Sequence, residues 1–181
     1  HLETVLGKTV VVLPQAAFHL DLFCTPLGER KMLVGDPRLA LDLLASLSVE
    51  QRAEVEIALA SQAQVKPEGL LARYTGAGQA EFDQAAAQLI DLGYEVERVP
   101  CLLPAERGDP TLSYNNVLIE DYQESDGKQV KKVYLPEYGC QPLDDAARKT
   151  YERSGYTVVA MPLAELSCRM GSLRCSALPT R

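Results

Sequence analysis

Two side chains near opposite ends of the sequence could act together as a nucleophile and its base. Cys175 follows the small residues Gly171 and Ser172, and a thiol becomes nucleophilic when a nearby base takes its proton. The sequence has two histidines, His1 at the first position and His19 within the chain. If Cys175 works with a histidine, we expect that histidine to be His19.

The cysteines do not follow the pattern of a metal site or of a disulfide framework. They are odd in number and widely scattered, and no Cys-x-x-Cys pair or Cys/His cluster has the spacing of metal ligands. We therefore expect no metal and no cofactor, and free thiols indicate a reducing, cytoplasmic location. Apart from Cys175, we interpret the cysteines as structural: Cys24, Cys101, Cys140 and Cys168.

Length and composition indicate a single globular domain that covers residues 1–181. Hydrophobic residues make up 46% of the chain and charged residues 24%, which is typical of a protein with a packed core. The net charge is −7 and no basic stripe is present, which argues against nucleic acid as a partner. No apolar run approaches the roughly 20 residues of a membrane-spanning helix, so we expect no membrane partner.

The first hundred residues predict an alternation of short strands and helices. Ser48 and Gln51 have the spacing of a capping box, and Gly93 is suited to end a helix. Pro100 is expected to stop the strand that follows Gly93. We expect strands at residues 9–13, 18–25, 31–34 and 94–99, and helices at residues 38–47, 48–63 and 79–92.

The second half predicts a hairpin followed by a helix and a strand. After a polar loop at residues 101–111, two strands are joined by Asp126-Gly127, which is a strong turn signal. The next helix is expected to end at Gly155. We expect strands at residues 113–120, 130–135 and 156–161, a helix at residues 143–154, and a closing strand at residues 172–181.

One sequence pattern occurs twice. The stretches 93–100 and 155–162 both read Gly-Tyr-x-Val-x-x-x-Pro, and each follows a helix. The run 10–14 matches the last part of the same pattern. The chain therefore predicts two units of strand-strand-helix-strand, one at about residues 18–100 with an extra helix inserted and one at about residues 113–162. Such repeats pack against neighbouring units.

The repeat predicts that His19 and Cys175 meet. Ser113 follows Pro100 at the same distance as Cys175 follows Pro162, and His19 also follows a closing strand. All three then stand at the entry to the first strand of a unit. If the units surround a pseudo-rotation axis, these positions form a ring around one central cavity.

Four stretches, taken together, resemble the guanidino-group modifying enzymes, or pentein superfamily, which includes arginine deiminase, agmatine deiminase, dimethylargininase and the amidinotransferases. Their order agrees with the C-terminal half of that family. The resemblance implies an α/β propeller of strand-strand-helix-strand units, of which this chain would hold about two to two and a half of the usual five. The stretches are His19-Leu-Asp21, Ser113-Tyr-Asn-Asn116, Val133-Tyr-Leu-Pro-Glu-Tyr-Gly139 and Gly171-Ser-Leu-Arg-Cys175.

The end of the chain and its middle resemble different members of that family. Arg174-Cys175 with Pro179 downstream is most similar to arginine deiminase, whereas Ser113-Tyr-Asn-Asn116 is more similar to agmatine deiminase. Both readings imply a role in arginine metabolism, without naming the substrate.

The resemblance implies a role for each candidate residue. Cys175 would attack the guanidinium carbon of a small cationic substrate, giving a covalent thiouronium. His19 would protonate the departing amine and then take a proton from water. Asp21, expected on the same strand face as His19, would accept two guanidinium N–H bonds. Asn116 lies near the expected cavity and is a candidate substrate contact.

Other interpretations remain open for the same residues. Cys175 could be a small buried hydrophobic residue, His19 a hydrogen-bonded strand residue, and Asp21 the cap of a turn. Asn116 could be a turn residue. The protein could also transfer the amidino group to an amine, or be a non-catalytic module that binds a partner or ligand.

The family carries further residues before its histidine that this sequence does not contain. These are a Gly-Gly-Asp stretch, whose aspartate holds the guanidinium, and an acidic residue that orients the histidine. We therefore expect an additional polypeptide, either an N-terminal half or a second copy of the chain, and an incomplete site in the isolated chain.

Overall fold

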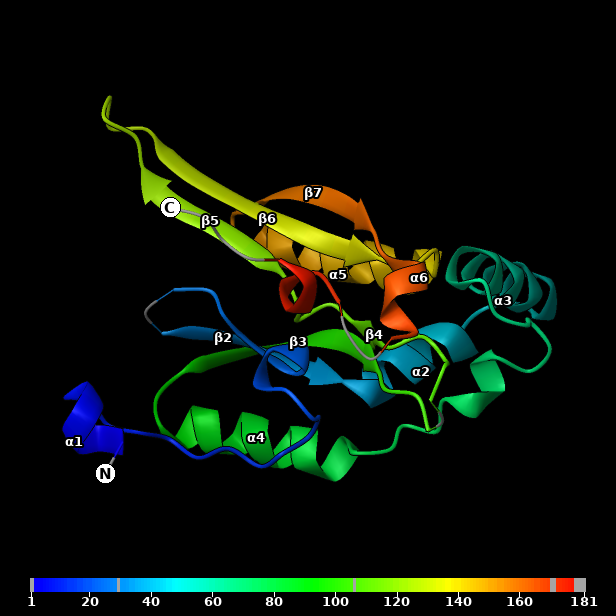
Figure 1. Ribbon diagram of the computed structural model, residues 1–181, viewed down its shortest axis with the longest axis horizontal. Coiled ribbons are helices and arrows are strands. Elements are labelled where there is room, and N and C mark those ends of the chain that lie inside the picture. The colour runs from blue at the N-terminus through cyan, green and yellow to red at the C-terminus, as the bar shows by residue number, and fades with distance from the viewer. Residues whose placement is uncertain (1, 29, 106, 170–171, 178–181) are drawn as a thin grey trace.

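The computed structural model of the chain describes residues 2–28, 30–105, 107–169 and 172–177 (Figure 1). The protein is a mixed α/β molecule with two sheets, in the strand orders β1-β2-β3-β4 and β5-β6-β7. The strands are β1 (Cys24–Pro26), β2 (Lys31–Asp36), β3 (Glu95–Leu102), β4 (Leu112–Ser113), β5 (Leu118–Gln123), β6 (Gln129–Glu137) and β7 (Thr157–Pro162).

The helices lie between and around these sheets (Figure 1). Helix α4 packs against β2 and β3, whereas α2 and α5 contact each other and both contact β3; α5 also contacts β6 and β7. The helices are α1 (Leu2–Leu6), α2 (Pro37–Ala45), α3 (Val49–Ala63), α4 (Gln79–Asp91), α5 (Gln141–Arg153) and α6 (Ala164–Ser167), with 3-10 turns η1 (Leu20–Leu22), η2 (Leu71–Arg73) and η3 (Arg174–Ser176). Among the helices of the described ranges, none combines the length and the apolar character needed to cross a bilayer.

The two predicted units follow the same path through the two sheets. In the first unit β1 is antiparallel to β2 and β2 is parallel to β3; in the second, β5, β6 and β7 repeat this arrangement. The repeated prolines occupy equivalent register positions, because Pro100 pairs with Asp36 and Pro162 pairs with Glu137. The pairing of the three strands is therefore the same in both units, although three helices, α2, α3 and α4, lie between β2 and β3, whereas α5 alone lies between β6 and β7.

Local signals at the helix ends are also confirmed. The Ser48 hydroxyl accepts a hydrogen bond from the Gln51 amide at 3.2 Å, and the Gln51 side chain accepts one from the Ser48 amide at 2.9 Å. Helices α4 and α5 are followed by Gly93 and Gly155, whose φ angles are +84° and +86°. Glycine adopts this left-handed conformation without strain, so both glycines let the chain turn into the next strand.

The β-branched run at residues 9–13 does not form the buried strand that its composition predicts. The run is outside both sheets, and Val12 is 79% exposed. The Val12 carbonyl accepts a hydrogen bond from the Gln88 side chain of α4 at 2.9 Å. A β-branched sequence favours a strand only when another strand is available to pair with it, and no pairing strand lies here among the described residues.

The predicted strand at residues 18–25 is mostly wrong. Only Cys24–Pro26 is a strand, because the chain first makes the 3-10 turn Leu20–Leu22. The Leu22 amide bonds to the His19 carbonyl at 3.2 Å, and this turn buries the Leu22 side chain completely. Burial of Leu22 therefore overrides the strand propensity of the segment.

Three further boundaries differ from the prediction. Strand β3 continues past Pro100. Its pairing with β2 ends at Pro100, and Cys101 then pairs with β4, so the residues after the proline stay in the sheet. The expected strand 113–120 is two strands separated by a turn at residues 114–117. The closing strand expected at 172–181 is wrong for residues 172–177, where Arg174–Ser176 is a 3-10 turn; residues 178–181 lie outside the described residues.

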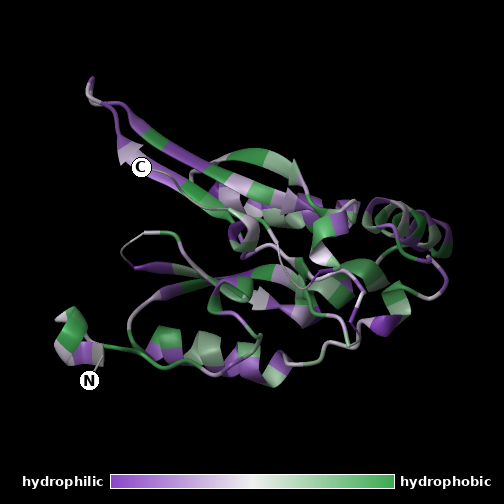
Figure 2. Cartoon of the chain, viewed as in Figure 1, coloured by the Kyte–Doolittle hydropathy of each residue, from purple (hydrophilic) through white to green (hydrophobic). Residues whose placement is uncertain are grey.

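Buried apolar residues of both units form one core cluster, and three completely buried tyrosines of the second unit belong to it. Tyr114 and Tyr138 pack edge to face with ring centroids 5.2 Å apart, and the Tyr151 hydroxyl donates to the Tyr114 carbonyl at 2.7 Å. Figure 2 shows apolar residues along the strands of both sheets, whereas the far end of the β5–β6 hairpin is mainly hydrophilic. The core is therefore shared between the units, and the hairpin end faces solvent.

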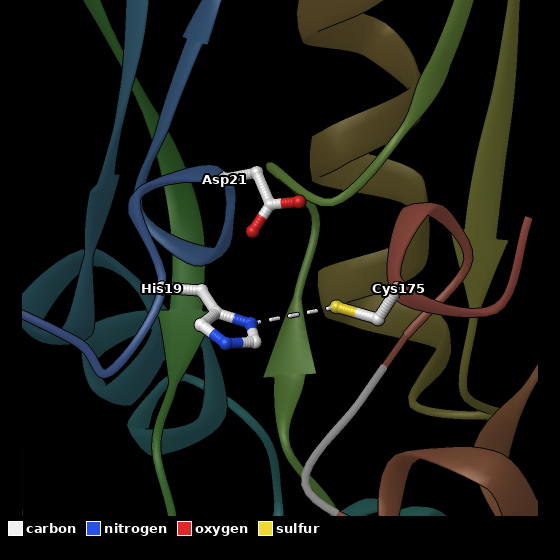
Figure 3. Close-up of side chains that lie close together, drawn as sticks. All are labelled: His19, Asp21 and Cys175. Carbon is white, nitrogen blue, oxygen red and sulfur yellow. Dashed lines mark hydrogen bonds between the residues drawn. The ribbon is translucent and has the colours of Figure 1, made fainter.

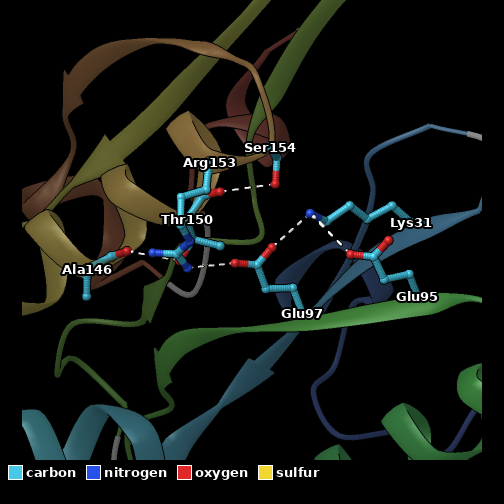
Figure 4. A network of polar contacts seen from close by, with 7 residues as sticks. All are labelled: Lys31, Glu95, Glu97, Ala146, Thr150, Arg153 and Ser154. Atoms are coloured by element: carbon cyan, nitrogen blue, oxygen red, sulfur yellow. Dashed lines mark hydrogen bonds and ion pairs between the residues drawn. The ribbon is translucent and has the colours of Figure 1, made fainter.

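An ion-pair network also crosses from one unit to the other (Figure 4). Arg153 of α5 donates to Glu97 of β3 at 2.6 Å, and Lys31 of β2 lies 3.0 Å from the same carboxylate. Burial opposes the charge on Glu97, but the bonds from Arg153 and Lys31 outweigh it and lower the pKa of this carboxyl. The network holds α5 of the second unit on the first sheet.

Candidate functional site

His19, Asp21 and Cys175 come together in space although they are far apart in sequence. The Cys175 sulfur lies 3.9 Å from His19 Nδ1. One nitrogen, oxygen or sulfur atom from each of the three residues lies within 4.8 Å of those from the other two. Figure 3 shows the ring nitrogen and the sulfur facing each other, with the carboxylate beside them. The predicted meeting of His19 and Cys175 is confirmed, and the roles assigned to them stay predictions.

His19 and Asp21 are presented by the turn that precedes β1. His19 has an extended backbone, with φ −126° and ψ 143°, and Asp21 lies in the 3-10 turn that follows. The prediction of a shared strand face is therefore wrong, although both side chains point to the same space (Figure 3). His19 is exposed and Asp21 is half-buried, so the site is open to small molecules.

The His19 turn is fixed to the first sheet. Leu22 and Phe23 are buried beneath it, and the Leu22 carbonyl accepts a hydrogen bond from the Ser113 hydroxyl at 2.5 Å. Ser113 belongs to β4, which pairs with the end of β3. Ser113 therefore anchors the turn and does not reach the three candidate groups directly.

Asn116 holds the turn that carries Cys175. Its side-chain oxygen accepts hydrogen bonds from the backbone amides of Arg174, at 2.8 Å, and Cys175, at 3.4 Å. Its side-chain nitrogen donates to the Cys175 sulfur at 3.4 Å. The side chain is completely buried, so its orientation is fixed. Asn116 positions the cysteine, and its predicted contact with substrate stays a prediction.

A second anchor of the same turn comes from Tyr138. Its hydroxyl lies 2.9 Å from both the Ser113 carbonyl and the Ser172 hydroxyl. Because a phenol has one proton and the carbonyl can only accept, Tyr138 donates to Ser113 and Ser172 donates to Tyr138. The Ser172 carbonyl in turn accepts a bond from the Ser176 hydroxyl at 3.1 Å. Tyr138 therefore connects the core to both sides of Cys175.

Asp144 accepts a hydrogen bond from the backbone of Tyr138 and so helps to fix its position. One of its carboxylate oxygens accepts from the Tyr138 amide at 3.0 Å and from the Tyr114 hydroxyl at 2.7 Å. Burial raises the pKa of the Asp144 carboxyl to about 6, although the hydrogen bonds from Tyr114 and Tyr138 act in the opposite direction. Sequence reasoning missed Asp144, since an aspartate in a helix has no local signal of this contact. Tyr138 lies in a stretch that carried the resemblance, but no role followed from it.

The three converging groups also have the chemistry of a zinc ligand set. A thiolate, an imidazole and a carboxylate are all ligands that Zn²⁺ accepts, and three protein ligands leave one position open. Spacing rules could not find this set, because its members come from distant turns. The expected absence of a metal therefore stays a prediction.

The other cysteines differ from Cys175 in their surroundings. Cys175 is exposed, and all five cysteines are free thiols. Burial raises the pKa of Cys24 to about 11 and those of Cys101 and Cys140 to about 12. Burial also raises the pKa of the half-buried Cys168. These surroundings disfavour a thiolate at the four other positions, in agreement with their interpretation as structural.

No protein-family model matches this chain, and no curated protein matches it. The geometry of the site and the resemblance in the sequence are therefore the basis on which a function can be proposed.

Proposed function

We propose that this protein is a pentein-type enzyme that hydrolyses a guanidino C–N bond through a covalent intermediate on Cys175. The observation that carries the proposal is the approach of Cys175 Sγ to His19 Nδ1, at 3.9 Å, with the Asp21 carboxylate beside both. A nucleophile, a proton carrier and a binding site for a planar cation are thus available within one small space. The two equivalent units support the pentein-type fold.

The first half of the reaction forms a carbon–sulfur bond. The Asp21 carboxylate accepts N–H bonds from the guanidinium and fixes its plane. The Cys175 thiolate attacks the central carbon, and the tetrahedral adduct then loses one nitrogen as the C–N bond breaks. His19 donates the proton that this nitrogen needs to leave as ammonia. The product of this half is a thiouronium on Cys175.

The second half consumes one water. His19, now neutral, takes a proton from the water as its oxygen attacks the thiouronium carbon. The C–S bond breaks and the thiolate of Cys175 is restored. Guanidinium and water are thereby converted into a ureido product and ammonium, with no oxidant, metal or cofactor. Exposure of His19 and Cys175 gives water access to this step.

The proposal includes a partner and a location. We propose that a polypeptide with further carboxylates, an N-terminal half or a second copy, completes the site and a larger propeller in the cytoplasm. Val11 and Val12 are exposed beside α4, where the Gln88 side chain contacts the Val12 carbonyl. Such a β-branched segment is suited to add a strand to an incoming sheet.

Labelling with 2-chloroacetamidine tests the proposal without requiring turnover. This amidine mimics a guanidinium and alkylates a thiol next to its binding site, so we expect a mass shift on the peptide that contains Cys175. The Asp21→Asn variant should react about tenfold more slowly with the amidine, because charge-assisted hydrogen bonds are lost. Its reaction with neutral iodoacetamide should be unchanged. Asp126→Asn, in the exposed hairpin turn, is the matched control.

Two results would reject the proposal. An equal rate of amidine labelling in the wild type and in Asp21→Asn would show that Asp21 does not bind the guanidinium group. Unchanged labelling of the protein in Cys175→Ser would show that another group reacts. Either result would favour a non-catalytic binding module, for which we expect ordinary thiol reactivity at Cys175.

Product analysis separates hydrolysis from amidino transfer. With the completing polypeptide supplied, incubation with a guanidino substrate should release ammonia at the same rate with or without glycine. A new guanidino product that forms only when glycine is present would instead assign the transferase reaction.

A zinc site is the second candidate, favoured by the ligand atoms of His19, Asp21 and Cys175 within 4.8 Å. Cobalt substitution gives the test, because a thiolate bound to Co²⁺ produces a charge-transfer absorption band. Such a band, lost in Cys175→Ser, together with amidine labelling only after chelation, would support the metal site. Labelling that is unaffected by EDTA would support the nucleophile.

A further inference from the structure

Strand β7 forms one margin of the second sheet, and its outer edge pairs with no strand among the described residues. It is parallel to β6 along its whole length, from Thr157 beside Lys132 to Pro162 beside Glu137. The strand order β5-β6-β7 ends with it, and Figure 1 shows it at the outside of the molecule. None of its residues is buried, so β7 presents an open edge.

The backbone groups on this edge follow from the pairing with β6. The Leu163 amide, directly after the strand, donates to the Glu137 carbonyl at 2.9 Å. Because successive residues of a strand direct their N–H and C=O groups to opposite sides, the odd-numbered residues of β7 face β6. Val158 and Ala160 therefore direct both groups outward, where none of the described residues bonds to them.

The side chains of β7 lack the charges that the equivalent strand of the first unit carries. Pro100 and Pro162 occupy equivalent register positions, so β3 and β7 can be compared residue by residue. Charged side chains on an edge strand are one means by which proteins prevent pairing with another chain. Three positions are charged in β3 and uncharged in β7, because Glu95, Glu97 and Arg98 correspond to Thr157, Val159 and Ala160.

Charge also decides which open edge suits contact between two copies of the chain. In an antiparallel pair about a two-fold axis, the central residue of the strand lies opposite its own copy. Through β3 this residue is Glu97, and through β5 it is Glu120 or Asp121, and like charges directly opposite are destabilising. Through β7 it is the uncharged Val159. Two chains that each carry a net charge of −7 associate best through such an uncharged contact.

We propose that two copies of this protein associate through β7, antiparallel about a two-fold axis, so that their second sheets form one continuous sheet. With Val159 at the centre, Val158 of each copy exchanges two hydrogen bonds with Ala160 of the other. Thr157 then lies opposite Met161, so no charged side chain of β7 enters the contact. The strand is complementary to itself, which favours a second copy over an unrelated partner. This inference does not depend on the proposed function.

A proline at Ala160 tests the hydrogen bonds of the contact. Ala160→Pro removes one outward N–H from each copy and leaves the bonds to β6 in place. In sedimentation velocity over a range of concentrations, we expect a dimer of the wild type and a dissociation constant about tenfold to 100-fold higher in Ala160→Pro. Ala160→Thr keeps the N–H and should dimerise as the wild type does. Circular dichroism checks that each variant is folded.

Charge reversal at Val159 tests the two-fold arrangement. Val159→Lys and Val159→Glu each set like charges opposite each other, so each variant alone should be a monomer. An equal mixture of the two should form a dimer with one chain of each, because the lysine of one chain then lies opposite the glutamate of the other. Native mass spectrometry identifies this mixed dimer. The result decides the proposal even if Ala160→Pro does not fold.

Three results would overturn the proposal. The first is a wild type that remains a monomer at every concentration. The second is a dimer that persists in Ala160→Pro and in both Val159 variants, since the contact then lies elsewhere. Val12 is 79% exposed, and a dimer lost in Val12→Lys but kept in the β7 variants would assign the contact to the N-terminal segment. The third is a dimer that each Val159 variant loses and the mixture does not restore.

Discussion

The turn that carries His19 and the turn that carries Cys175 face each other but are held by different forces. Both are 3-10 turns, and both are bonded to the segment 113–116, which connects the two sheets. The His19 turn is fixed mainly by apolar burial, since Leu22 and Phe23 are buried beneath it. The Cys175 turn, Arg174–Ser176, is exposed and is bonded to the polar side chain of Asn116, although Leu173 before it is buried.

This difference predicts two kinds of variant. Loss of apolar burial costs stability, because the whole core around the His19 turn must adjust. Loss of a polar anchor at the Cys175 turn should displace the sulfur while most of the fold remains.

The largest effect is expected from Leu22→Ala. Leu22 is completely buried, so its truncation leaves a cavity and should lower the free energy of unfolding by about 2–5 kcal/mol. Leu20 lies in the same turn with 58% of its surface exposed, and Leu20→Ala should change stability by less than about 0.5 kcal/mol. Urea denaturation followed by circular dichroism measures both. Equal losses would contradict apolar anchoring of this turn.

Asn116→Ala should mainly affect the position of Cys175. Its side chain makes three contacts with residues 174 and 175, so we expect amidine labelling to slow by about 100-fold. Asn115 is equally buried and bonds to Thr25 and the Leu33 carbonyl instead. Asn115→Ala should therefore reduce stability by about 1–3 kcal/mol with little change in labelling. Similar labelling in the two variants would show that Asn116 does not position the thiol.

The buried carboxyl below Tyr138 predicts a pH-dependent stability. The pKa of Asp144 rises to about 6 in the folded state, above the value of about 4 expected when unfolded, because burial disfavours its charge. The folded protein thus binds this proton more tightly than the unfolded chain does. The protonated Asp144 therefore contributes to the free energy of unfolding fully below about pH 4, and this contribution is lost as pH rises through 6. The difference in unfolding free energy between the wild type and Asp144→Asn should fall by about 2 kcal/mol over this range. A constant difference in urea titrations from pH 4 to 7.5 would contradict this.

Removal of a single tyrosine hydroxyl should change the free energy of unfolding least. Tyr138→Phe removes the bond to Ser172, whereas Tyr151→Phe removes one to the Tyr114 carbonyl, and both tyrosines are completely buried. Each variant should lose about 1 kcal/mol of stability. Only Tyr138→Phe should slow amidine labelling of Cys175, by roughly threefold to tenfold. If Tyr151→Phe slows labelling equally, the effect is a general loosening of the core.

Features encoded by neighbouring residues could be predicted from the sequence. The capping box at Ser48 and the glycines at 93 and 155 act through their own backbone, so local patterns sufficed. The repeated prolines marked equivalent register positions in the two units. Counting from these prolines predicted that His19 and Cys175 lie close together, and the structure shows this. A repeat thus indicates which residues distant in sequence occupy equivalent positions, which a single motif does not.

Features that depend on partners distant in sequence could not be predicted. The valines at residues 9–13 have strand propensity but no strand to pair with among the described residues. The 3-10 turn at Leu20–Leu22 depends on burial of Leu22 against the sheet. The contacts of Asn116 with Cys175 and of Asp144 with Tyr138 arise from folding, and no spacing rule reveals them.

The central claim is that Cys175 forms a covalent thiouronium with a guanidino substrate. The most direct measurement mixes the protein, together with the polypeptide that completes its site, with arginine or agmatine. The reaction is quenched in acid within its first turnovers, and the mass of the peptide that contains Cys175 is determined. We predict an amidino adduct on this peptide in the wild type and none in Cys175→Ser. Ammonia release without any adduct on Cys175, or an adduct that persists in Cys175→Ser, would contradict the account.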